Sequence, residues 1–270
     1  MSAPSDLARP VLTAFGLTHP GQKRGSNEDA IGTFVDDRLF VVADGVGGHS
    51  AGDIAASTAV DALAAFFRTF HADPRQVWPH PVDRSISLGA NLLRVGVKVA
   101  NDKVRAAAAG DRSRSRMAST IVAMAIGDSQ ISIAHTGDSR AYRIRGNRID
   151  RLTRDHSIME EMMAARPDIS PEEIATFQHR NVVTKCLGSK DEIDPTVSVE
   201  PLLHGDIYLL CTDGLWGVVP DEKVVEIVRS TEDLNAACAL LVDAANEAGG
   251  PDNISAILVS VNGGPRGQSR

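Results

Sequence analysis

The chain has 270 residues, 43% of them hydrophobic, with three cysteines and a formal net charge of −7 at pH 7. This length suits a single domain with a sizeable core. The acidic balance argues against nucleic acid or a membrane as partner, and no apolar run approaches the length of a membrane span. Because the cysteines lack a zinc-like spacing and residues 1–10 lack a signal sequence, we expect a cytoplasmic protein, monomeric by default.

Alternation, helical spacing and turn residues define the first half of the chain. Residues 1–10 are polar and predict a disordered tail, and a polar loop follows the first strand at 19–29. The expected strands are 11–18, 30–35 and 39–43, the last two joined by a turn at 36–38, and the expected helices are 53–70 and 83–109.

Strands dominate the second half, interrupted by one segment of different character. Ser157 and Ser170 each precede a capping pattern, which predicts two short helices within 155–182. The expected strands are 120–126, 131–135, 141–145, 197–200, 207–212 and 254–261, and the expected helices are 221–229 and 234–247. The order predicts an α+β fold: a four-layer α-β-β-α sandwich of two antiparallel sheets flanked by helices, one domain over 11–262, followed by a disordered tail at 263–270.

Three aspartates stand at the ends of apolar runs. Asp44 follows the run 39–43, Asp213 follows 207–212, and Asp252 precedes 254–259. In an antiparallel sheet the start of one strand lies beside the end of its neighbour. We therefore expect these carboxylates to meet at one edge of one sheet. The glycines after Asp44 would let the backbone adopt unusual conformations there and let a ligand approach closely.

Further acidic residues, Glu28, Asp29 and Asp138, have the chemistry to join this cluster. Carboxylates are hard oxygen donors, which favour Mg²⁺, Mn²⁺ or Ca²⁺ over zinc or copper. Two ions about 3.5–4 Å apart would offset the repulsion and activate a bridging water. Arg24 lies five residues before Asp29 and suits a phosphate in fork geometry. The combination points to phosphoester hydrolysis.

Six motifs in this order and spacing resemble those of a known family. They are Arg24-(three residues)-Glu28-Asp29, Asp44-Gly45-Val46-Gly47-Gly48-His49, His135-Thr136-Gly137-Asp138-Ser139-Arg140-Ala141-Tyr142, Leu152-Thr153-Arg154-Asp155-His156-Ser157, Cys211-Thr212-Asp213-Gly214 and Pro251-Asp252-Asn253. From about 13 to 261 the sequence resembles bacterial members of the metal-dependent protein phosphatase family, type 2C.

The resemblance implies a β-sandwich fold, two core Mn²⁺ or Mg²⁺ ions and a variable flap at 155–182. The reaction it implies is hydrolysis of phosphoserine or phosphothreonine in proteins by a metal-activated water, opposing a serine/threonine kinase. By the same resemblance Asp44 bridges the ions, Gly45 ligates one through its carbonyl, Asp213 and Asp252 ligate the other, Glu28 and Asp29 assist, Asp138 matches a third-ion position, and Arg24 binds the substrate phosphate.

Two positions depart from the family pattern, Val46 and Ala118, and only the first bears on the chemistry. Many eukaryotic relatives carry a histidine, proposed as the general acid, where this chain has Val46. We interpret His49 and His156 as structural histidines, and the proton for the leaving group is left to metal-bound water.

Several alternatives stay open. Arg24 would otherwise pair with Glu28 or Asp29, and Asp138 would otherwise cap a turn. Met159, Met162 and Met163 suit either core packing or contact with a partner. The basic run at 112–116 suits either a solvated loop or peptide recognition. For the whole chain, the alternatives are a non-catalytic metal-binding module and a phosphatase specialised for one switch protein.

Overall fold

The computed structural model describes residues 9–47, 51–109, 111–177 and 182–263. The expected tails therefore fall almost entirely outside these residues, as does His49.

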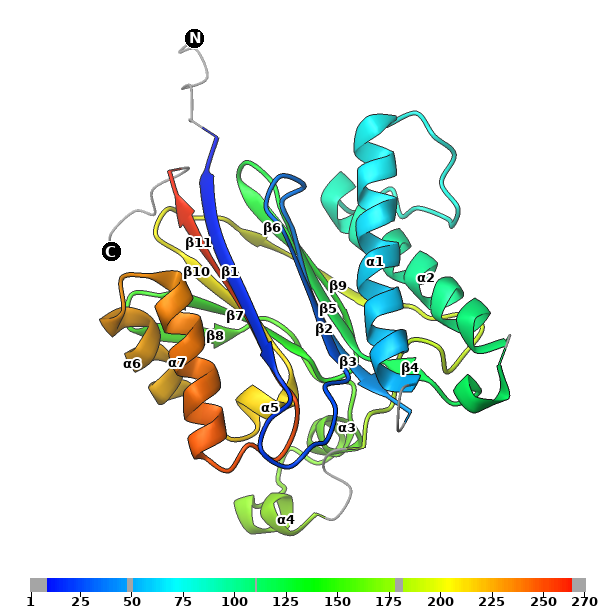
Figure 1. The fold of residues 1–270 in the computed structure, drawn as a ribbon. Helices are drawn as coiled ribbons and strands as arrows, with labels where there is room; N and C mark the ends of the chain where they lie inside the picture. The colour runs from blue at the N-terminus through cyan, green and yellow to red at the C-terminus, as the bar shows by residue number, and fades with distance from the viewer. Residues whose placement is uncertain (1–8, 48–50, 110, 178–181, 264–270) are drawn as a thin grey trace.

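Two antiparallel sheets pack face to face (Figure 1). The first sheet has the order β1-β11-β10-β7-β8, with bounds Val11–His19, Ile254–Asn262, Ile207–Cys211, Arg140–Arg145 and Arg148–Arg151. The second has the order β2-β3-β5-β6-β9, with bounds Asp29–Phe34, Leu39–Val46, Ile121–Ile126, Gln130–Thr136 and Thr196–Pro201, and β4 (Ala118–Ser119) pairs with the end of β3.

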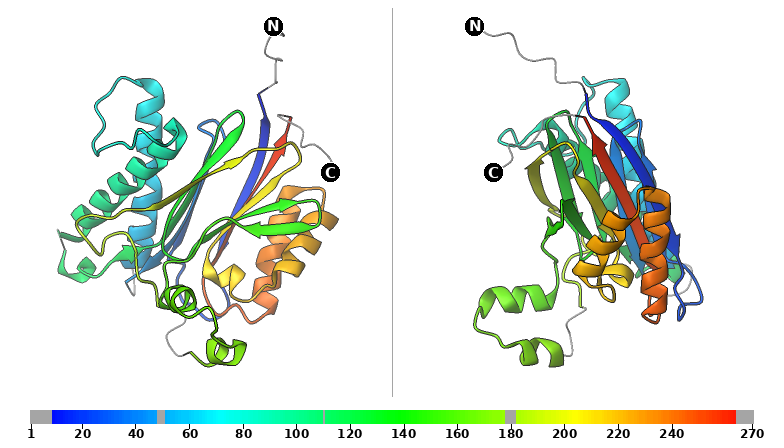
Figure 2. Two further views of the ribbon diagram at one scale, coloured as in Figure 1. Left: turned by 180° about the vertical axis from the view of Figure 1, so that it is seen from behind. Right: turned by 90° about the vertical axis from the view of Figure 1, so that its left-hand side faces the viewer.

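Helices cover the outer faces of both sheets, and two more lie at one end of the sandwich (Figures 1 and 2). The second sheet is covered by α1 (Ala51–Ala72) and α2 (Leu88–Ala109), and the first by α5 (Asp213–Trp216), α6 (Asp221–Ser230) and α7 (Leu234–Glu247). The helices α3 (Ile158–Ala165) and α4 (Pro171–Thr176) lie in the segment that we expected to be a flap, and we keep the name flap for these two helices; η1 is a 3-10 turn at Arg112–Arg114. The expected four-layer architecture is confirmed.

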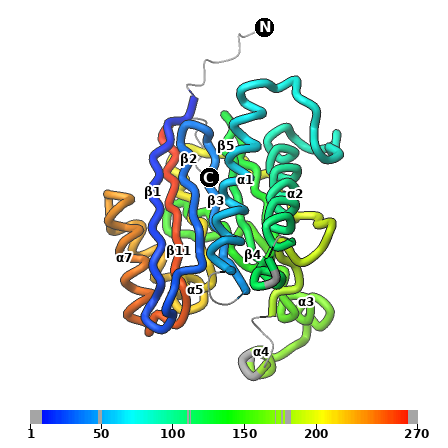
Figure 3. Tube along the Cα trace, turned by 45° about the vertical axis from the view of Figure 1, so that its right-hand side comes forward, coloured from blue at the N-terminus to red at the C-terminus, as the bar shows by residue number. Residues whose placement is uncertain are grey.

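Strand β3 shows why the middle of the sheet is apolar without alternation. Its residues Phe40 and Val42 point into the core between the sheets, whereas Leu39, Val41 and Ala43 pack under α1 and α2. A strand buried on both faces needs apolar side chains at every position. In the tube view, α1 lies against this sheet with α2 beside it (Figure 3).

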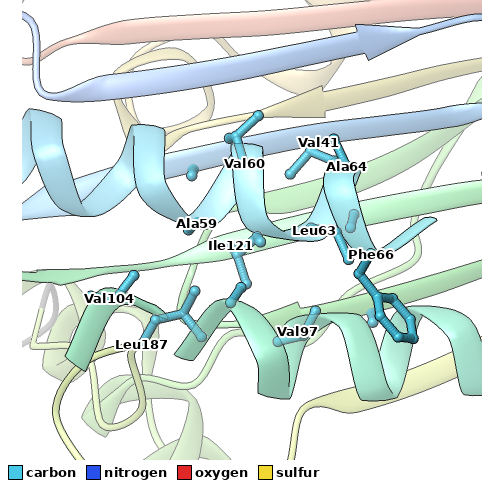
Figure 4. Packing of buried hydrophobic residues seen from close by; sticks show 14 of the residues in the cluster. Val41, Ala59, Val60, Leu63, Ala64, Phe66, Val97, Val104, Ile121 and Leu187 are labelled. Carbon is cyan, nitrogen blue, oxygen red and sulfur yellow. The ribbon is translucent and has the colours of Figure 1, made fainter. Parts of the chain in front are cut away.

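The helical layer over β3 is packed closely because small residues separate the large ones. Leu63 and Phe66 of α1 lie over the part of α2 around Val97, whereas Val104 lies farther along α2, beside Leu187 (Figure 4). A Cβ added at Gly96 would lie 2.3 Å from Leu63 Cδ1. Glycine at this position therefore sets how closely the two helices approach.

Most elements agree with the sequence-based expectations, and the differences have local causes. Helix α2 begins at Leu88 rather than at Asp83, because the Asp83 carboxylate accepts hydrogen bonds from the backbone and hydroxyl of Ser85 at 2.8 and 2.6 Å. That competition favours a turn over a helix. The short elements β8 and α5 were not expected. Both helix starts in the flap are confirmed, and Ser170 forms a full capping box.

Among the residues that the structure describes, no helix combines the length and the apolar character that crossing a bilayer requires.

Candidate active site

The three aspartates converge, but both sheets supply them. Asp44 lies in β3 of the second sheet, whereas Asp213 begins α5 two residues after the end of β10 and Asp252 lies two residues before β11, both strands of the first sheet. The expectation of one edge of one sheet was therefore wrong. The strands instead face each other across the inter-sheet core, in which Val42 packs with residues such as Ile257, so their ends meet at one end of the sandwich.

A cavity of about 440 Å³ opens at this end. Its wall includes six of the predicted site residues, together with Gly45: Arg24, Glu28, Asp44, Asp138, Asp213 and Asp252. Asp29 lies behind them, in a buried position. The structure thus brings the whole predicted set together, including Glu28 and Asp138, which come from other parts of the chain.

Strand β3 does not end at Asp44. It continues to Val46 because Gly45 and Val46 pair with Ser119 and Ala118 of β4. The Asp44 backbone is held from the same side: Thr120 N–H donates to Asp44 O at 2.8 Å, and Asp44 N–H donates to Thr120 Oγ1 at 3.3 Å. Asp44 therefore stands on paired, rigid backbone rather than on a loop.

A steric reason accounts for the glycines that follow Asp44 and Asp213. A Cβ at Gly45 would lie 2.0 Å from the carbonyl oxygen of Gly52, and one at Gly214 would lie 1.9 Å from that of Asn253. Neither glycine has a positive φ. The expected unusual backbone conformation is thus absent at these two described positions, and the close approach is made by the protein's own backbone.

Asp29 is held rigidly with one oxygen left over. It pairs directly across from Asp44 in the β2–β3 ladder, and its Oδ2 accepts hydrogen bonds from Ser255 Oγ at 2.7 Å and Thr212 Oγ1 at 2.9 Å. Its Oδ1 is buried without a hydrogen-bond partner. Burial raises the pKa of Asp29 to about 7, opposed by the two hydroxyl donors and reinforced by the charge of Asp213.

The neighbouring carboxyls carry the same electrostatic cost. Burial, then the charges of Asp29 and Asp213, raise the pKa of Asp44 well above its usual range. Burial raises the pKa of Asp138 to about 7, with repulsion from Asp213 adding to it. Burial and the charge of Asp252 raise the pKa of Asp213 to about 6. A cation bound among these carboxylates would offset both the cost of burying their charges and the repulsion between them.

Arg24 enters the cavity from the loop between β1 and β2. Its Nη2 donates to Asp252 Oδ2 at 2.7 Å, so Arg24 forms an ion pair with Asp252, a partner that the sequence did not indicate. This hydrogen bond, opposed by desolvation, raises the pKa of Arg24. The Arg24 side chain is 57% exposed.

Asn253 organises the loop that carries Arg24 and Glu28. Its Oδ1 accepts from Glu28 N–H at 2.8 Å, and its Nδ2 donates to Ser26 O at 2.8 Å and Pro20 O at 2.9 Å. Sequence reasoning assigned Asn253 no role. Its only signal was its place beside Asp252 in a quoted motif.

A second set of contacts fixes Asp138 and joins it to the base of the flap. Trp216 Nε1 donates to Asp138 O at 3.1 Å, and Arg140 stacks on the Trp216 ring at 3.4 Å. Arg140 also donates to both oxygens of Asp155 at 2.7–3.2 Å. His156 exchanges hydrogen bonds with Gly137 next to Asp138: its Nδ1 accepts at 3.1 Å and its backbone N–H donates at 2.9 Å. His156 is therefore structural, as expected.

The donor set fits a divalent metal, although the described residues contain no ready-made group of three or more His, Cys, Asp or Glu side chains arranged around one point. Two carboxylate oxygens, Asp29 Oδ1 and Asp213 Oδ1, are buried without hydrogen-bond partners. A buried, unpartnered carboxylate oxygen is costly unless a cation or donor satisfies it. All donors are oxygens, which suits Mn²⁺ or Mg²⁺.

The comparisons with known proteins agree with this chemistry. The family model described as Protein phosphatase 2C matches residues 21–258. The protein phosphatase PhpP of Streptococcus pneumoniae is 34% identical over 249 residues, which cover 91% of this chain and 96% of PhpP.

Two solved structures are similar throughout. The serine/threonine phosphatase Stp1 of Staphylococcus aureus is 28% identical, with a TM-score of 0.82, covering 97% of this chain and 100% of Stp1. The catalytic domain of the serine/threonine protein phosphatase PstP, in complex with two manganese ions, is 27% identical, with a TM-score of 0.78, covering 94% of this chain and 99% of PstP.

Proposed function

This chain belongs to the protein phosphatase 2C family, and from that premise we propose that it is a metal-dependent hydrolase of phosphoserine and phosphothreonine in proteins, with its catalytic site in the cavity around Asp44. The observation that carries the proposal is the convergence of Asp44, Asp138 and Asp213 on one cavity beside Arg24, with buried carboxylate oxygens that lack partners. When bound, Mn²⁺ or Mg²⁺ would lower the pKa of a water molecule, so that this water could act as the nucleophile toward phosphorus at neutral pH.

The residues of the chain would divide the remaining work. Asp44 would hold both ions, with the Gly45 carbonyl on one side and Asp213 and Asp252 on the other. Glu28 and Asp29 would support this set, and Asp138 would hold a third ion together with Asp213. These assignments follow the family motifs and the cavity wall.

Arg24, which lines the cavity, would bind the substrate phosphate through its guanidinium group. Its hydrogen bond to Asp252 would orient it there, and a planar fork of donors suits phosphate oxygens. Val46 also lines the cavity but has no proton to donate, and no histidine contributes to this wall within the described residues.

For the cellular context we propose a cytoplasmic monomer that reverses the action of a serine/threonine kinase on shared protein targets. The names of the relatives support phosphoprotein substrates: PhpP is a protein phosphatase and Stp1 a serine/threonine phosphatase.

The variant Asp44→Asn tests the catalytic proposal. It keeps the shape of the side chain but removes the charge that would hold both ions, so release of phosphate from phosphothreonine peptides and from p-nitrophenyl phosphate with Mn²⁺ should fall by about 10³-fold or more. The matched control is Asp61→Asn on the exposed face of α1, which should keep full activity. A fully active Asp44→Asn protein would contradict the assignment. An inactive wild type would favour the alternative of a non-catalytic binding module.

A further inference from the structure

A second cavity, of about 520 Å³, lies directly beside the proposed catalytic cavity. It separates the flap from α5 and the loop before β11, at the end of the sandwich where α3 and α4 stand (Figure 2). Asp213 and Asp252 belong to the walls of both cavities. A substrate chain whose phosphate lies in the first cavity could therefore also reach the second.

The walls of this second cavity carry both apolar and charged side chains, and the apolar ones come from two sides. The flap contributes one side and the body of the domain the other, through Met159, Met163, Ile174, Trp216, Val218 and Pro251. Met159 and Met163 are four residues apart in α3, so they share one face of the helix. Met162, which we had grouped with them from the sequence, is not part of this wall.

Four charged side chains of the same wall, Arg140, Asp155, Arg151 and Glu160, are already paired with one another, while Asp213 and Asp252 belong to the proposed metal site. Arg140 makes a bidentate contact with Asp155, whose side chain is 6% exposed. Arg151 pairs with Glu160 at 3.2 Å, and Glu160 also accepts from Arg154 at 3.0 Å. An incoming charge would have to break one of these pairs, whereas an apolar group would displace water from the methionines and Trp216 without that cost.

We propose that this cavity, which we call the flap subsite, takes a large apolar side chain of the substrate, such as leucine or methionine, within two residues of the phosphorylated residue. The inference rests on the proposed phosphatase function and deepens it. Consecutive Cα atoms are about 3.8 Å apart, so a position one or two residues from the phosphate reaches a cavity that shares its rim. Methionine side chains on one wall would adapt to different apolar groups.

The test compares substrates with and without a flanking residue. Phosphothreonine peptides on a serine/glycine background carry a single leucine at −2, −1, +1 or +2, and p-nitrophenyl phosphate serves as a substrate that cannot reach the flap subsite. The variants are Met163→Ser and Ile174→Ser. The matched control is Met162→Ser, which changes the same helix outside the wall. Melting temperature checks that each variant is folded.

The proposal requires that leucine at one or more positions raise kcat/KM of the wild type by about tenfold over the unsubstituted peptide. The two subsite variants should lose most of this gain, while Met162→Ser and all activities on p-nitrophenyl phosphate stay within about twofold. The proposal is wrong if no position of leucine raises kcat/KM, or if the gain survives both variants. If the wild type does not hydrolyse p-nitrophenyl phosphate at all, that result would instead count against the phosphatase function itself.

Discussion

Removing the side chain of Asn253 should loosen the loop that carries Arg24 and Glu28. Asn253 is 6% exposed, and three hydrogen bonds of 2.8–2.9 Å join its amide to backbone groups of Glu28, Ser26 and Pro20. Each such bond contributes about 0.5–1.5 kcal/mol net. Asn253→Ala should therefore lower the free energy of unfolding by about 3 kcal/mol, which for a domain of this size corresponds to about 6 °C in melting temperature.

The assay is urea unfolding and thermal melting in EDTA, so that bound metal does not add to the measured stability. Asn147→Ala, at an exposed turn position between β7 and β8, is the matched control and should change stability by less than about 0.5 kcal/mol. Asn253→Asp keeps the acceptor for Glu28 N–H but turns an oxygen toward two carbonyls, so it should be no more stable than the alanine variant. With Mn²⁺ present, both variants should also lose kcat/KM on phosphopeptides, since Arg24 and Glu28 are no longer fixed.

The reasoning would be refuted by an Asn253→Ala protein that unfolds within about 0.5 kcal/mol of the wild type. That result would mean that the loop is positioned by something other than this amide. A protein that is destabilised as expected but retains full activity would separate the two parts of the argument, and would show that the loop need not be rigid for catalysis.

Three further outcomes follow from the same structure. Gly45→Ala should lower stability by more than about 2 kcal/mol, because its Cβ would lie 2.0 Å from Gly52 O, whereas Gly25→Ala, with open space around it, should be silent in the same melting assay. Mn²⁺ at a hundredfold excess over its Kd should stabilise the wild type by about 2.7 kcal/mol relative to EDTA, and an unchanged melting curve would count against a multi-carboxylate site. Burial lowers the pKa of His156 to about 4, below the ~6.5 of an unfolded chain, so protons favour the unfolded state as pH falls from ~6.5 toward ~4. After allowance for partial exposure, the free energy of unfolding of the wild type should fall by about 1 kcal/mol more between pH 7 and pH 5 than that of His156→Gln. If the two proteins show the same pH dependence, the lowered pKa of His156 is refuted.

The helical flap shows how far local signals reach. Ser157 and Ser170 were recognised as helix starts from the residues beside them, and both side chains cap their helices. Capping depends on atoms only three residues apart, so the sequence contains the whole interaction. By contrast, the wall of the flap subsite joins Met163 to Trp216 and Pro251, and such distant contacts leave no local pattern.

The same distinction applies to the charged site. The order of the motifs identified Asp44, Asp213 and Asp252 as candidate ligands, and their carboxylates already indicate oxygen coordination of a hard cation. The sequence did not show that Asp29 keeps one oxygen unpartnered, or that Arg24 binds Asp252. These facts depend on side chains more than 200 positions away, since Asp29 is held by Ser255 and Arg24 by Asp252.

The sequence by itself determined which residues are apolar on one or both faces, where most helices and strands lie, and which acids are candidate metal ligands, because periodicity and residue type are local properties. Only the tertiary structure decided that two sheets, not one, bring these acids together. Two sheets meet because each buries one face against the other, and the ends of their strands then share a single cavity. No property of β3, β10 or β11 alone fixes that meeting.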